Sequence, residues 1–131
     1  MKLDHIGIVV EDIEAALAVY EAALGLPLEN IVEVPEQGVR VAFLSLGESN
    51  IELVQPTADD TGTAKFLTRR GEGVHHICIE VDDIRAALAR LKAHGVQLID
   101  EEPRPGAHGE VAFVHPRGAH GVLIELLEHG R

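Results

Sequence analysis

Basic and aromatic side chains are scarce in this sequence of 131 residues. It has 11 Lys and Arg against 22 Asp and Glu, a net charge of −11, three Phe, one Tyr and no Trp. Nucleic acid is therefore excluded as an expected partner, because a phosphate backbone attracts a basic surface and bases stack on aromatic rings. An anionic small substrate stays possible, because Lys65, Arg69 and Arg70 are clustered.

Cysteine and long apolar runs are also nearly missing. Cys78 is the one cysteine. It has no partner for an internal disulfide, which fits a reducing compartment. No apolar run approaches the ~20 residues that span a bilayer, and no charged lead with an apolar core precedes the first strand pattern. We therefore expect a cytoplasmic protein without a membrane segment.

An internal repeat is the most informative feature that is present. Segments 3–18 and 74–89 align without a gap at a spacing of 71 residues, and His5 falls on His76. Self-similarity of this kind indicates one supersecondary unit used twice. A chain of this length forms one compact body, so each half is a module and not an independent domain.

Each module reads as a strand, a helix and three further strands. Residues 3–10 alternate between two faces as a strand does, and Asp12 then caps a helix that ends at Gly25 and Pro27. The other expected strands are 28–34, 38–47 and 50–55, then 74–81, about 96–100, 110–114 and 121–127, with a second helix from Asp83 to about His94. The prediction is an α+β fold in one domain, 1–131, with module 1 at about 1–56, a linker helix within about 57–73 and module 2 at about 74–131.

Two histidines and two glutamates are the candidate site residues. His5 and His76 lie on the strand face away from the helices, and Glu52 and Glu125 each interrupt an apolar last strand. A buried carboxylate needs a partner, because an unpaired one is costly in an apolar environment. Taken singly, each histidine could be a packed core residue and each glutamate could face solvent.

If the modules pack with pseudo-twofold symmetry, the four side chains converge on one point. Imidazole nitrogen and carboxylate oxygen without thiolate suit one divalent ion of Co, Mn, Ni, Fe or Zn. Next to this set, His75 points to the opposite strand face and is expected to be structural. Cys78 faces the site, but its repeat partner is Gly7, so we expect a small space-filling residue.

Longer motifs accompany these positions. They are Pro35-Glu36-Gln37-Gly38-Val39, Val74-His75-His76-Ile77, Gly106-Ala107-His108-Gly109, and His115-Pro116-Arg117 followed by Gly121-Val122-Leu123-Ile124-Glu125-Leu126. Together they resemble the methylmalonyl-CoA epimerase family of the vicinal oxygen chelate, or glyoxalase, superfamily. The resemblance implies paired βαβββ modules forming a curved sheet around a metal held by His5, Glu52, His76 and Glu125. It also implies an acyl-CoA substrate and a homodimer.

The resemblance further implies a reaction, in which (R)- and (S)-methylmalonyl-CoA interconvert by α-proton abstraction through a metal-stabilised enolate. Glu125 is the expected base. Several members of the family carry a second glutamate where this chain has Val41, so either Glu125 works alone or another group serves the second face, with Gln37, Glu48 and His108 as candidates. The alternatives are a lactoylglutathione lyase and a metal-free small-molecule-binding module of the same fold.

Overall fold

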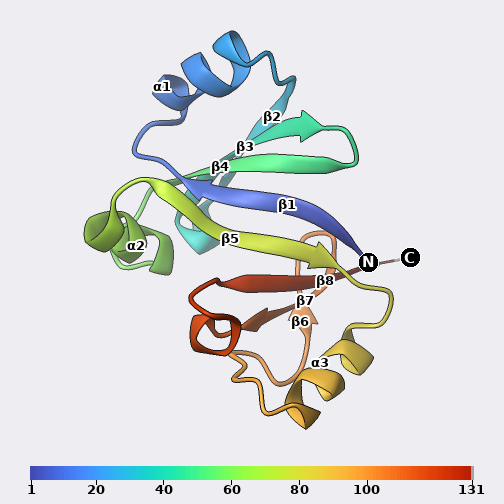
Figure 1. Ribbon diagram of the computed structural model, residues 1–131. Coiled ribbons are helices and arrows are strands. Elements are labelled where there is room, and N and C mark those ends of the chain that lie inside the picture. Colours follow the sequence, from blue (N-terminus) through green and yellow to red (C-terminus); the bar gives the residue numbers. More distant parts are fainter. Residues whose placement is uncertain (131) are drawn as a thin grey trace. The chain divides into compact units, whose positions relative to one another are not determined.

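The structure, a computed structural model, describes residues 1–130 and divides into two compact units (Figure 1). The first unit is His5–His75, and the second unit is Met1–Asp4 together with the chain from His76 onward. Within residues 1–130, no helix has the length and apolar character needed to cross a membrane.

The first unit contains four strands, with β2, β3 and β4 antiparallel and β1 parallel to β4. Their order in the sheet is β2-β3-β4-β1. The elements in chain order are β1 (Lys2–Val9), α1 (Ile13–Leu17), a π-helical turn η1 (Ala18–Ala23), β2 (Leu28–Val34), a 3-10 turn η2 (Pro35–Gln37), β3 (Val39–Leu46), β4 (Ser49–Pro56) and α2 (Gly62–Arg70).

The first helix begins as expected but does not stay α-helical to Leu24. Asp12 caps it by accepting the N–H of Glu14. From Ala18 the helix widens, and the Leu24 N–H donates to the Val19 carbonyl at 2.8 Å, a five-residue step. The wider turn keeps Tyr20 packed on the core before Gly25, at φ 83°, ends the helix. A π-turn of this kind is not visible in the hydrophobic period.

The two faces of the first sheet carry different clusters. One face holds Ile8, Ala42 and Leu53, which pack with Ile13 of α1. The other face holds Val9, Val39, Val41 and Val54, with Phe66 and Leu67 of α2 packed against them. Side chains of a strand alternate between faces, so α2 covers the face to which His5, Gly7 and Glu52 also belong.

The second unit repeats the plan with strand order β5-β8-β7-β6. Its helix α3 is capped by Asp83 and buries Ile84 and Leu88 against the sheet. The elements are β5 (Gly73–Glu80), α3 (Ile84–Ala93), β6 (Arg104–Pro105), β7 (Gly109–Val114), a 3-10 turn η3 (Pro116–Ala119) and β8 (Ile124–His129). The expected α+β class with two βαβββ modules is confirmed.

The expected strand at 96–100 is wrong. This segment makes one isolated bridge, Leu98 to Val114, and the strand that follows the helix is β6, Arg104–Pro105. The reason is a side chain, since the Asp100 carboxylate accepts the Phe113 N–H at 2.8 Å in place of a backbone carbonyl. The last strand also begins at Ile124 and not at 121, because His120 and Gly121 adopt positive φ in a turn.

The repeat extends to polar contacts. Gln55 Oε1 accepts the Ile13 N–H at 2.9 Å, and Glu128 Oε1 accepts the Ile84 N–H at 2.8 Å, so the last strand caps the helix in both units. Each helix also forms a two-bond ion pair with a neighbouring strand, but the charges are reversed. The two pairs are Glu14–Arg40 and Arg85–Glu110.

The reversed ion pairs give a prediction about stability. Glu14→Arg or Arg40→Glu alone places two like charges together and should lower the melting temperature, whereas the double variant recreates the orientation of Arg85–Glu110 and should recover most of the loss. Thermal unfolding at low and high salt measures both effects, because salt screens exposed charges. A double variant no more stable than the singles would contradict the pairing.

The same pair sets an acid dependence. The Arg40 guanidinium lowers the pKa of the Glu14 carboxyl below its ordinary 4.5. The stabilisation is therefore present at neutral pH and is lost as the pH falls through the lowered value. The stabilisation by the wild-type pair should disappear in this acidic range, as measured by the melting temperature against pH.

Candidate metal and active site

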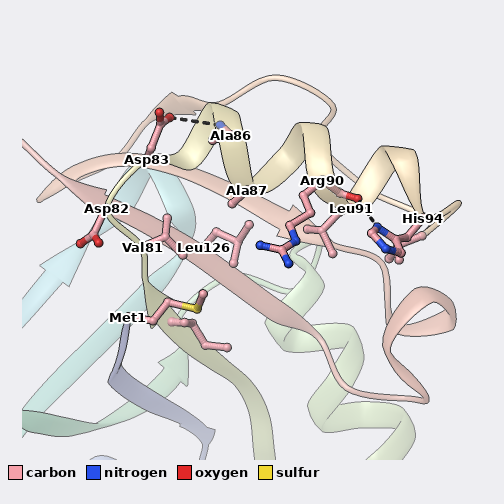
Figure 2. Close-up of a pocket in the computed structure, with 12 residues that line it drawn as sticks. Met1, Val81, Asp82, Asp83, Ala86, Ala87, Arg90, Leu91, His94 and Leu126 are labelled. Atoms are coloured by element: carbon pink, nitrogen blue, oxygen red, sulfur yellow. Dashed lines mark hydrogen bonds between the residues drawn. The ribbon is translucent and has the colours of Figure 1, made fainter.

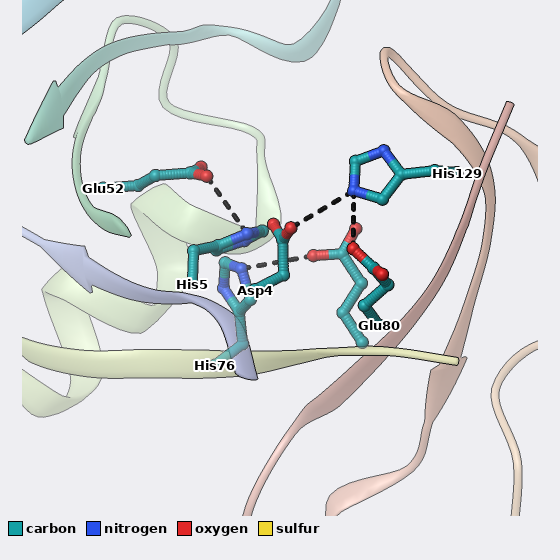
Figure 3. Close-up of polar contacts among 7 residues, drawn as sticks. Asp4, His5, Glu52, His76, Glu80 and His129 are labelled. Atoms are coloured by element: carbon teal, nitrogen blue, oxygen red, sulfur yellow. Dashed lines mark hydrogen bonds and ion pairs between the residues drawn. The ribbon is translucent and has the colours of Figure 1, made fainter. Parts of the chain in front are cut away.

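His5 and Glu52 form the first candidate pair, on β1 and β4 of the first unit. The parallel ladder sets Glu52 opposite Gly7, and His5 Nδ1 lies 3.1 Å from Glu52 Oε2 (Figure 3). His5 is 7% exposed, and among residues 1–130 it is the one buried residue of the polar and charged types. The carboxylate therefore has the partner that its apolar strand requires.

His76 and Glu125 form the second candidate pair, on β5 and β8 of the second unit. Here the parallel ladder sets Glu125 opposite Cys78, and His76 Nε2 lies 3.3 Å from Glu125 Oε1. Cys78 is fully buried, as expected of a space-filling residue at the position equivalent to Gly7.

Both pairs occupy the same place in their modules. In each, the glutamate lies on the last strand, opposite a small residue of the first strand and opposite a phenylalanine of the neighbouring antiparallel strand. The phenylalanines are Phe43, paired with Glu52, and Phe113, paired with Glu125. The Phe113 ring meets the His76 ring edge-on, with centroids 6.4 Å apart.

Phe43 and Phe113 were not singled out from the sequence. The histidines are 71 residues apart and the glutamates 73 apart, so a gap-free comparison of the halves does not align the last strands. A gap of two residues in the first module before Glu52 would have aligned the two glutamates. Each pair can supply an imidazole nitrogen and a carboxylate oxygen to a divalent ion.

Val41 is surrounded by apolar side chains. It is 8% exposed and belongs to the cluster of Val9, Val39 and Val54 beneath α2. A charged carboxylate at this position would lose hydration among these side chains. The apolar residue therefore fits its environment, and no proton-transfer group stands there.

The other expected residues lie as follows. His75 packs edge-on against Phe66 at 5.1 Å between ring centroids, in keeping with a structural role. Gln37, Glu48 and His108, the candidates for a second base, are exposed residues of turns and loops.

A cavity of about 640 Å³ opens beneath α3 in the second unit (Figure 2). Ile79, Val81 and Leu126 of its lining alternate along their strands with Cys78 and Glu125. The cavity therefore lies on the helix-covered face, opposite to the His76–Glu125 pair. This cavity is therefore not the candidate active site.

A further polar cluster lies at strand ends of the second unit. His129 Nε2 is 2.9 Å from Glu80 Oε1 and 3.4 Å from Asp4 Oδ1 (Figure 3). This contact was not predicted, because the three residues come from strands far apart along the chain.

Comparison with known proteins identifies the family. The profile of the Glyoxalase/Bleomycin resistance protein/Dioxygenase superfamily matches residues 4–113. The human mitochondrial methylmalonyl-CoA epimerase is 44% identical over 127 residues, which cover 95% of this chain and 72% of the human protein. The chain belongs to the methylmalonyl-CoA epimerase family.

Two other members of the family match over nearly their whole length. The ethylmalonyl-CoA/methylmalonyl-CoA epimerase of Cereibacter sphaeroides is 42% identical, over 95% of this chain and 96% of that protein. A solved methylmalonyl-CoA epimerase in complex with methylmalonyl-CoA is 38% identical with a TM-score of 0.88, covering 98% of this chain and 94% of that one. The resemblance found in the sequence motifs is thus confirmed, and so is the fold.

Proposed function

We propose that this protein interconverts (R)- and (S)-methylmalonyl-CoA with one divalent metal ion as cofactor. The observation that carries the proposal is the pair of equivalent His–Glu contacts, one in each module, in a chain of the epimerase family. A module that only bound small molecules would not need two imidazole–carboxylate pairs in register.

The proposed metal ligands are His5, Glu52, His76 and Glu125. The imidazole nitrogen and the carboxylate oxygen lie 3.1 Å apart in the first pair and 3.3 Å apart in the second, so the two groups of each pair could bind one ion together. Two carboxylates also balance the charge of a divalent ion. Co, Mn, Ni, Fe and Zn all accept this ligand set, so the element remains to be measured.

The metal, when bound, supplies Lewis acidity that stabilises negative charge developing on the substrate's oxygen atoms. The chain's own residues supply positioning and proton transfer. Glu125 removes the proton between the carboxylate and the thioester, and a positioned base of this kind contributes roughly 10²–10⁴ in rate. The ring of His76 holds the Glu125 carboxylate at 3.3 Å.

Either Glu125 alone or a second group returns a proton to the opposite face. Val41 cannot be that second group, so the two-glutamate scheme does not carry over intact to this chain. Phe43 and Phe113 lie opposite the two glutamates on the neighbouring strands, and we infer that their rings limit the access of water to the carboxylates.

The remaining expectations stay predictions. They are a homodimer, a cytoplasmic location and a single domain spanning 1–131. The human relative is a mitochondrial protein by name, so members of this family occupy more than one compartment.

The metal proposal predicts that His76→Ala loses both the ion and the activity, because an alanine removes one of four ligands. The matched control is His75→Ala, which changes the adjacent histidine on the other strand face. Metal content per chain, measured on purified folded protein by elemental analysis, should be about one for the control and near zero for His76→Ala. Full occupancy and turnover in the His76 variant would remove the site.

The base assignment predicts different results for the same change in the two modules. An amide oxygen can still bind metal but cannot accept a proton, so Glu125→Gln should keep the ion and lose roughly 10²–10⁴ in kcat. Glu52→Gln, at the equivalent position, should keep most of the activity. Similar kcat values for the two variants, each with metal bound, would place the base elsewhere.

The reaction itself is tested in deuterated water. The metal-loaded protein should convert one methylmalonyl-CoA epimer into the other with deuterium at the inverted carbon, because proton removal exposes that carbon to exchange with solvent. Methylglyoxal with glutathione should give no lactoylglutathione. Efficient lactoylglutathione formation would favour the lyase. Absence of inversion with metal bound would favour a binding module.

A further inference from the structure

Helix α2 (Gly62–Arg70) has a charge composition unlike that of the chain. Lys65, Arg69 and Arg70 lie on this nine-residue helix, and it contains no acidic residue, although acids outnumber bases two to one overall. We call these three side chains the basic face of α2.

The basic face is free of ion pairs. Elsewhere in the described part of the chain, Lys2, Arg40, Arg85 and Arg104 each lie within 4.0 Å of a carboxylate, whereas Arg90, Lys92 and Arg117 do not. Among residues 1–130, Lys65, Arg69 and Arg70 form no ion pair, and all three are exposed. Arg70 instead lies over the Phe66 ring, with its guanidinium carbon 5.7 Å from the ring centroid.

The helix borders the His5–Glu52 pair. Phe66 and Leu67 pack on a cluster that contains Val54. Val54 lies two residues beyond Glu52 on β4 and therefore on the same face of the sheet. Two residues of a strand span about 7 Å, so the helix covers the sheet directly beside the pair.

Helix stability explains only part of this arrangement. Cations in the last turn interact favourably with the helix dipole, which accounts for Arg69 and Arg70. Lys65 lies a full turn before Arg69, where the dipole gives no such benefit, yet the i, i+4 spacing puts the two on one side of the helix. Two unpaired cations side by side repel each other unless an anion binds between them.

We propose that Lys65 and Arg69, with Arg70 at their side, bind the phosphate groups of the coenzyme A thioester. This inference rests on the proposed function. Coenzyme A carries a diphosphate and a 3′-phosphate, and its pantetheine arm separates them from the thioester. Cations that recognise these phosphates must therefore lie outside the reaction site. Lys65, Arg69 and Arg70 meet this requirement, because they are exposed on a helix whose Phe66 and Leu67 pack on the sheet beside the His5–Glu52 pair. Charge-assisted contacts to phosphate suit both lysine and arginine.

The test compares methylmalonyl-CoA with methylmalonyl-pantetheine, which has the same reacting group and no phosphate. In the metal-loaded double variant Lys65→Gln with Arg69→Gln, KM for methylmalonyl-CoA should rise roughly fivefold or more, as expected for the loss of two exposed ionic contacts. Its kcat should not change, and KM for methylmalonyl-pantetheine should equal that of the wild type. Added salt should raise KM for the CoA substrate more in the wild type than in the variant.

The matched control is Arg90→Gln with Lys92→Gln, which removes the same charge from exposed residues near the end of α3. It should leave both KM values unchanged. An equal rise of KM for the two substrates in the α2 variant, or the same rise in the control, would overturn the inference.

Calorimetric titration with coenzyme A itself separates this inference from the proposed reaction, because binding needs no turnover. Weaker binding in the α2 variant supports the inference even if the wild type does not epimerise. Epimerisation with unchanged coenzyme A binding in the variant overturns the inference and leaves the reaction in place.

Discussion

The parallel pairing of the first and last strands of each module is the constraint on which the candidate site depends. It sets Glu52 opposite Gly7 and Glu125 opposite Cys78. A slip of one residue would turn each glutamate to the other face of its sheet, which α1 covers in the first unit and α3 in the second, and where Leu53 and Leu126 now fill the core. The register is therefore fixed by the apolar residues beside the glutamates. The small residue opposite each carboxylate then allows a histidine from the same first strand to reach it.

The sequence predicted this arrangement where local signals and the repeat agree. The strand at 28–34 was located to the residue, and Asp12 and Asp83 cap the two helices as expected. The prediction failed where a side chain replaces a backbone group, as Asp100 does for Phe113, and where the helix widens after Leu17. Neither effect changes the hydrophobic period from which the elements were derived. Phe43 and Phe113 were not predicted as neighbours of the glutamates. The spacing between the two glutamates is two residues longer than the spacing between the two histidines, so a gap-free comparison does not align the last strands of the modules.

The two modules keep the same geometry with different chemistry. Glu14–Arg40 and Arg85–Glu110 join helix to strand at equivalent places with opposite charges, so the contact and not the sign of the charge has been retained. The residue that caps each helix from the last strand is likewise Gln55 in one unit and Glu128 in the other. Backbone N–H groups at a helix start need an acceptor oxygen, and an amide and a carboxylate both provide one. Replacement of a carboxylate by an amide would likewise be tolerated at Glu52 if this residue only binds metal. It would not be tolerated at Glu125 if that residue also moves a proton.

A net charge of −11 does not oppose an anionic substrate, because the range of a charge in physiological salt is short. Exposed charges farther apart than about 8 Å are largely screened from each other. The acidic residues nearest to the basic face of α2 then affect anion binding there more than the net charge of the chain does. Helix α2 itself contains no acidic residue. This helix lies in the segment that joins the two repeats and has no counterpart in the second module. The repeat could supply two equivalent His–Glu pairs by duplication, whereas recognition of an asymmetric substrate with phosphates at one end requires an element that occurs once. The segment between the modules is where the fold can provide it.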